Sequence, residues 1–224
     1  MHIDMNGTND CRRYIDKLAN IGTNYSRGRL ILSASAGGYA NTNYYLDDTR
    51  NIDYRSYSFG LAASNRLVEL GASPASLSYL DRPNDQTLTG HITNAINVAA
   101  FFSYGVHGYY GDTNADYAIN TNIVFSGSSS WYLINTVESF NGTRYRISQG
   151  LFVKWFSSNA FGGTNYSNTP VGAISYSDEP GYSYVNRPDS FFGMWHIKKN
   201  FGMCAWQTIL QPCVHAVGDP LVIK

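Results

Sequence analysis

Two stretches decide the fold: Val98-Ala-Ala-Phe-Phe-Ser103, continued by Tyr104-Gly-Val-His-Gly108, and Trp131-Tyr-Leu-Ile-Asn-Thr136, continued by Val137-Glu-Ser-Phe-Asn-Gly142. Each begins with a short, largely apolar run, which is typical of a strand buried on both faces. Each then reaches a glycine-containing segment with a side chain suited to catalysis, His107 in the first and Ser139 in the second. Because the carboxyl ends of parallel strands meet at one edge of a sheet, we expect these side chains to share a rim.

Strand-like and helix-like segments alternate through the rest of the chain. We expect strands at 29–35, 75–80, 98–104, 131–136 and 171–176, and helices at 11–19, 59–70, 87–97, 150–158 and 189–200. Two segments rich in Asn, Tyr, Gly and Ser, 39–57 and 109–130, are expected to be long loops. The alternation predicts an α/β fold with three α/β/α layers around a mostly parallel sheet. Since no repeat or linker interrupts it, residues 1–224 are expected to form one domain.

The composition indicates which kinds of binding partner and which cellular compartment to expect. The 16 basic residues balance the 16 acidic ones, which argues against a nucleic-acid groove or an anionic membrane surface. No apolar run approaches the roughly 20 residues of a membrane span, and the first residues carry no signal-peptide core. The abundance of Tyr, Gly, Asn and Ser is common in secreted bacterial proteins. Because the sequence begins within a strand-like pattern, we expect it to be a piece of a longer protein that is secreted or displayed at the cell surface. The three cysteines, Cys11, Cys204 and Cys213, have no metal-site spacing and are expected to be buried free thiols.

Ser139 has two interpretations that the residues alone leave open. A histidine near neutral pH can move protons, and Gly108 leaves the His107 ring open to an approaching ligand. His107 could therefore activate the Ser139 hydroxyl as a nucleophile. Alternatively, Ser139 merely closes a strand before an Asn141-Gly142 turn, because its surroundings are not the Gly-x-Ser-x-Gly elbow of hydrolases.

Four aspartates are secondary candidates for the site. Asp47 and Asp48 fall in the first long loop, where they could orient His107 or bind a cationic group, although most loop carboxylates are simply solvated. Asp112 and Asp116 could bind a cation such as calcium, but they lack the glycine and terminal glutamate of an EF-hand loop. No cofactor is predicted.

Five short motifs, spread in order over almost the whole chain, together resemble the gingipain-type cysteine peptidases, which share the caspase-like fold. They are Ile15-Asp-Lys17, Leu32-Ser-Ala-Ser-Ala-Gly-Gly38, Tyr104-Gly-Val-His-Gly108, Val137-Glu-Ser-Phe-Asn-Gly142 and Val217-Gly-Asp-Pro220. The third is similar to the segment of the family's catalytic histidine, and the fourth to the segment of its nucleophilic cysteine. The resemblance therefore implies a caspase-like sheet and a peptide or protein as substrate or ligand.

The resemblance also assigns roles to particular residues. His107 matches the catalytic histidine, and Asp47 falls where arginine-specific members hold the carboxylate that meets a basic substrate side chain. Two positions depart from the pattern: Ser139 stands at the cysteine position and Ala36 at that of an auxiliary acid. A serine hydroxyl ionises far less readily than a thiol, so the expectation is a peptidase fold without cysteine peptidase activity. The alternatives are a hydrolase with a Ser139–His107 dyad, and a peptide-binding or structural surface module.

Overall fold

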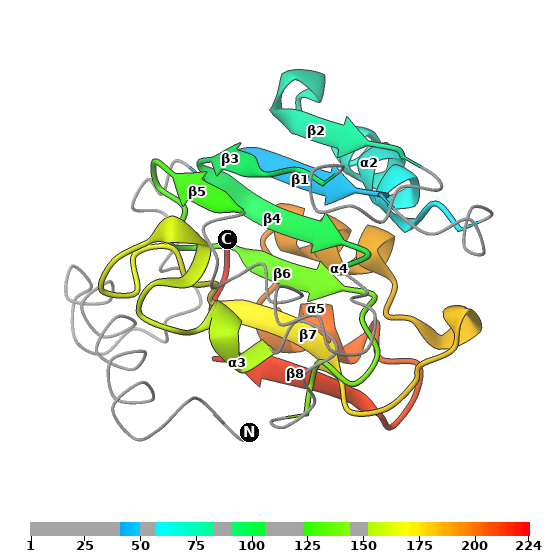
Figure 1. Cartoon of the computed structure of the whole chain (residues 1–224). Helices are drawn as coiled ribbons and strands as arrows, with labels where there is room; N and C mark the ends of the chain where they lie inside the picture. The colour runs from blue at the N-terminus through cyan, green and yellow to red at the C-terminus, as the bar shows by residue number, and fades with distance from the viewer. Residues whose placement is uncertain (1–40, 50–56, 83–90, 106–122, 144–151) are drawn as a thin grey trace, which may run out of the picture.

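The computed structural model of the 224-residue chain describes residues 41–49, 57–82, 91–105, 123–143 and 152–224 (Figure 1). The expected helix at 11–19, the expected strand at 29–35, and the residues Cys11, Ala36, His107, Asp112 and Asp116 all lie outside these ranges.

A six-stranded sheet in the order β2-β1-β4-β6-β7-β8 forms the centre of the fold. Its strands are β1 (Asn43–Asp47), β2 (Leu77–Leu80), β4 (Val98–Ser103), β6 (Leu133–Thr136), β7 (Gly172–Tyr176) and β8 (Val214–Gly218). All neighbouring pairs are parallel except β7 and β8, which are antiparallel. Strands β4 and β6 are buried at every position, as their apolar runs predict. The expected α/β fold with a mostly parallel sheet is confirmed.

Three helices cover one face of the sheet: α2 (Phe59–Glu69), α4 (Pro188–His196) and α5 (Phe201–Trp206) (Figure 1). Helix α2 ends at Gly71, whose φ of +91° is in the left-handed region that glycine favours. The amide of Gly71 donates to the carbonyl of Val68, and that of Ala72 to Leu67, which is the Schellman pattern of helix termination. Leu67 and Ala63 of this helix belong to the core beneath it, where both are fully buried.

The described part of the other face is mostly not helical. A small parallel sheet of β3 (Asn94–Ile96) and β5 (Val124–Ser126) packs there with the short helix α3 (Phe152–Trp155) and the 3-10 turn η5 (Ala160–Gly162). Aromatic rings fill this second core, and the stacked pair Phe125 and Phe161 has centroids 4.4 Å apart. Two further 3-10 turns, η3 (Pro74–Ser76) and η6 (Tyr182–Tyr184), lie in connecting segments.

Three sequence-based expectations about elements are wrong. The loop expected at 39–57 contains β1, which pairs on one side with β2 and on the other with β4. The loop expected at 109–130 contains β5, and the helix expected at 87–97 contains β3, because these two segments pair with each other. In each case a partner strand from another part of the chain overrides the local composition.

Smaller differences concern helix ends and the last strand. The helix expected at 189–200 stops at His196, and a new one begins at Phe201 because the Asn200 side chain accepts a hydrogen bond from the Met203 amide and caps it. The helix expected at 150–158 is reduced to α3. The segment Val214–Gly218, not predicted as a strand, forms the edge strand of the sheet beside β7.

Candidate functional site

The carboxyl ends of β1, β4 and β6 bring three polar side chains into one row. Asp47 pairs in register with Ser103, and Ser103 pairs with Thr136. All three residues are almost completely buried. Adjacent strands lie about 4.8 Å apart, so the row spans roughly 10 Å of the rim.

Ser139 lies in the turn that follows β6, at the rim that the sequence predicts. The residue is 5% exposed. The next residue, Phe140, has a φ of +59°, which is rare for a bulky side chain. Its carbonyl accepts hydrogen bonds from the amide and the hydroxyl of Thr143, which close the turn. Five other non-glycine residues of the described chain also have a positive φ, so this turn is one of several with left-handed backbone.

Asn141 and Gly142 fasten this turn to β7. The Asn141 side chain donates to the Thr136 hydroxyl (2.8 Å) and accepts from the Tyr176 amide (2.8 Å). Gly142 approaches so closely that a Cβ there would lie 2.8 Å from the Tyr176 carbonyl carbon and oxygen. The Asn-Gly pair therefore does more than form a turn, because it holds the segment that contains Ser139 against β6 and β7.

Glu138 is a rim residue that the sequence reasoning did not single out. The carboxylate is fully buried and accepts a hydrogen bond from the Thr136 hydroxyl (3.0 Å). It also lies against Gly105, where a Cβ would be 2.0 Å from Cγ of Glu138. Gly105 has a φ of +80° and begins the segment that leads to His107. The sequence signal that could have pointed to Glu138 is an acidic residue in the largely apolar segment at the end of a strand.

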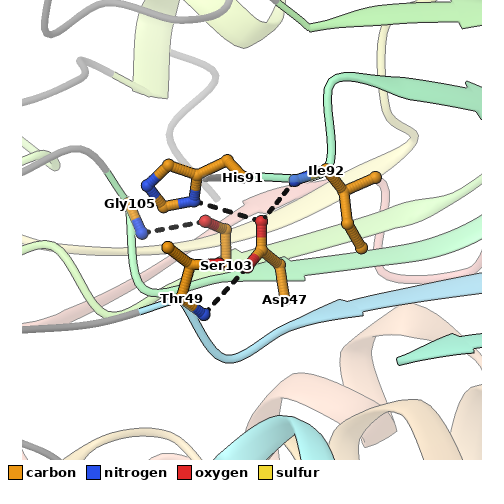
Figure 2. A network of polar contacts seen from close by, with 6 residues as sticks. All are labelled: Asp47, Thr49, His91, Ile92, Ser103 and Gly105. Carbon is orange, nitrogen blue, oxygen red and sulfur yellow. Dashed lines mark hydrogen bonds and ion pairs between the residues drawn. The ribbon is translucent and has the colours of Figure 1, made fainter. Parts of the chain in front are cut away.

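Asp47 is buried rather than solvated, contrary to the usual behaviour of a loop carboxylate. It accepts hydrogen bonds from the backbone amides of Thr49 (2.9 Å) and Ile92 (2.8 Å). The same carboxylate lies 3.1 Å from Nδ1 of His91 (Figure 2). Ser103, its neighbour on β4, accepts from the Gly105 amide (2.9 Å), so polar groups lie side by side at the ends of β1 and β4. His91 is the second site residue that the sequence reasoning missed.

Asp48 points to the opposite face and has a structural role. Its two carboxylate oxygens accept hydrogen bonds from the amides of Gly60 (2.8 Å) and Leu61 (3.0 Å), at the first turn of α2. Negative charge is stabilising at a helix N-terminus, where amides lack partners within the helix. The neighbouring residues Asp47 and Asp48 therefore join the end of β1 to two different segments, residues 91–92 and the start of α2.

Strands β4 and β6 are neighbours, so the segments that follow them leave the sheet side by side. The shared rim for His107 and Ser139 stays a prediction, because His107 lies outside the described residues. Within the described ranges, no group of three or more His, Cys, Asp or Glu side chains is arranged to hold a metal. None of the helices described is long and apolar enough to cross a membrane.

Comparison of the chain with protein-family models, with curated proteins and with solved structures finds no match. Evidence on function therefore comes from the residues of the rim and from the motifs in the sequence.

Proposed function

We propose that the chain is a gingipain-like domain of caspase-like fold that lacks cysteine peptidase activity and binds peptide segments at the carboxyl rim of its sheet. The observation that carries this proposal is the position of Ser139 at the end of β6, beside the β4 end that leads to His107. This is the arrangement that the two motifs require if they belong to one site. In the full-length protein we propose a secreted or surface location.

The chemistry of Ser139 supports loss of the cysteine reaction. A thiol near a histidine ionises easily and is intrinsically nucleophilic, whereas a serine hydroxyl needs a base placed within hydrogen-bond reach. Replacement of the auxiliary acid by Ala36 removes a second part of the site that the resemblance implies. The two departures act in the same direction, which favours binding over catalysis.

An active serine hydrolase is the second candidate. The place of Ser139 directly after β6, beside the β4 end that leads to His107, supports this candidate as well. In this candidate Ser139 is the nucleophile and His107 the general base.

Labelling distinguishes the two candidates. A fluorophosphonate reacts with activated serines, and a peptidyl chloromethyl ketone with activated thiols or with a histidine beside an activated nucleophile. We expect neither probe to label the wild-type protein. Fluorophosphonate labelling that disappears in both Ser139→Ala and His107→Ala would refute the proposal and establish the hydrolase.

The substitution Ser139→Cys tests whether the rest of the site persists. We expect this variant to gain labelling by the chloromethyl ketone. Ser128→Cys is the control, because the Ser128 amide donates to the Asn97 side chain just before β4, at the opposite end of the strands. Ser128 is half-buried, so a cysteine there is at least as accessible as one at position 139. Equal labelling of the two variants would show that position 139 has no special reactivity.

A further inference from the structure

We propose that Tyr44, His196 and Lys224 form a pH-sensitive latch, which holds segment 219–224 against the helix side of the sheet while His196 is neutral and opens when His196 takes up a proton. The three residues come from β1, from the end of α4 and from the segment that follows β8. Tyr44 lies near the amino end of its strand, away from the rim. The inference is therefore independent of the proposed function.

The Tyr44 hydroxyl is the centre of the latch. Nζ of Lys224 donates a hydrogen bond to it, and Nδ1 of His196 lies 2.7 Å from the same oxygen. The Lys224 ammonium also lies over the Tyr44 ring, 4.7 Å from the ring centroid. Tyr44 is buried, and its hydroxyl has no third hydrogen-bond partner among the described residues. Three elements that are far apart in the sequence are thus joined through one oxygen atom.

The positions of the hydrogens follow from this geometry. An ammonium can only donate, so the Tyr44 oxygen accepts from Lys224. Burial raises the pKa of Tyr44, so the hydroxyl keeps its own hydrogen and donates it to Nδ1 of His196. His196 is then neutral, with its hydrogen on Nε2. A proton added at Nδ1 would leave the buried hydroxyl hydrogen without an acceptor and would place a second cation beside Lys224.

No acidic group offsets that second charge. Within the ranges that the structure describes, no carboxylate forms an ion pair with His196 or Lys224. Lys198, just beyond α4, adds a further positive charge near Lys224. On the neighbouring helix α2, Arg66 and Glu69 pair with each other at 2.9 Å. Protonation of His196 therefore meets repulsion that its surroundings do not relieve.

The pKa of His196 has the sign that such a latch requires. Burial lowers this pKa below its usual value of about 6.5, and so does the Lys224 ammonium, against a hydrogen bond with the Leu70 backbone that raises it. The unfolded chain consequently takes up this proton at a higher pH than the folded protein does. The contribution of the latch to stability is complete above about pH 6.5 and is lost as the pH falls toward the lowered pKa.

The backbone bonds of segment 219–224 supply a probe of its position. Nε1 of Trp131 donates to the carbonyl of Ile223, the residue next to Lys224, at 2.8 Å. When the latch opens, we expect this bond to open more often and the indole hydrogen to exchange faster with solvent. Trp195 is the control, because its indole donates to the Ala99 carbonyl (3.0 Å) inside the core.

Exchange of the two indole hydrogens is followed by NMR between about pH 7.5 and about pH 5, with the intrinsic pH dependence of exchange divided out. We expect the protection of Trp131 to fall roughly three- to tenfold on acidification, the equivalent of one hydrogen bond, while that of Trp195 stays constant. His196→Asn keeps a side-chain acceptor for Tyr44 but cannot be protonated at neutral or acidic pH. This variant should keep the protection of Trp131 at both ends of the range.

A second measurement follows the His196 ring itself. Lys224→Met removes the neighbouring cation, so the pKa of His196, read from its ring proton shifts, should rise. Tyr44→Phe should also raise it, because the donor to neutral Nδ1 is lost. Three results would overturn the latch: Trp131 protection that does not depend on pH in the wild type, the same pH dependence in His196→Asn, or a pKa of His196 that is unchanged in both Lys224→Met and Tyr44→Phe.

Discussion

Gly105→Ala tests the contact that joins the ends of β4 and β6. The backbone at this position has a φ of +80°, which costs an alanine about 1–2 kcal/mol. The new Cβ would also lie 2.0 Å from Cγ and 2.2 Å from Cδ of Glu138, so the buried carboxylate must move. Overpacking of this kind costs about 1–3 kcal/mol. Together the two costs amount to a loss of about 2–5 kcal/mol in the free energy of unfolding.

Urea denaturation and thermal melting measure this loss. For a domain of this size, a loss of about 2–5 kcal/mol corresponds to a fall of about 4–20 °C in melting temperature. Gly71→Ala is the matched control, because Gly71 has a φ of +91° but nothing within 4 Å of the Cβ position. Adding Glu138→Ala to Gly105→Ala should cost less than the sum of the single changes, since the clash disappears. If Gly105→Ala destabilises no more than Gly71→Ala, the Glu138 contact is refuted.

Three other predictions concern the described residues. Asp48→Ala removes the acceptor of two helix amides and should lower the free energy of unfolding by about 1–3 kcal/mol in urea, whereas an unchanged midpoint would contradict the capping role. Burial lowers the pKa of Lys224 from 10.5 to about 8, so the folded protein loses this proton first. The free energy of unfolding should therefore rise between about pH 8 and 10.5, and urea titrations of Lys224→Met should show no such rise. Cys204 should resist a disulfide reagent until the protein unfolds, because burial raises the pKa of its thiol to about 12. A reaction in the folded protein that is as fast as that of an exposed thiol would contradict this expectation.

The two motifs at the ends of β4 and β6 needed no structure to be found. Their apolar runs are long enough to be buried strands and too short to be helices, and parallel strands end at a common rim. The helix at 59–70 and the strand at 171–176 could also be predicted from the sequence, because local periodicity and glycine residues at their ends decide them. Where a neighbour from far along the chain decides the structure, as for β1 and β3, the same reasoning failed.

The sequence by itself determined the α/β class, the neighbouring strand ends and the serine at the nucleophile position of the resembled motif. Only the tertiary structure decided the partners of the acidic residues. Asp47 meets His91 from 44 positions away, Asp48 caps a helix that begins 11 residues later, and Glu138 reaches across to Gly105. The physical reason is that a carboxylate can be buried only where donors converge on it, and those donors come together only when the sheet forms.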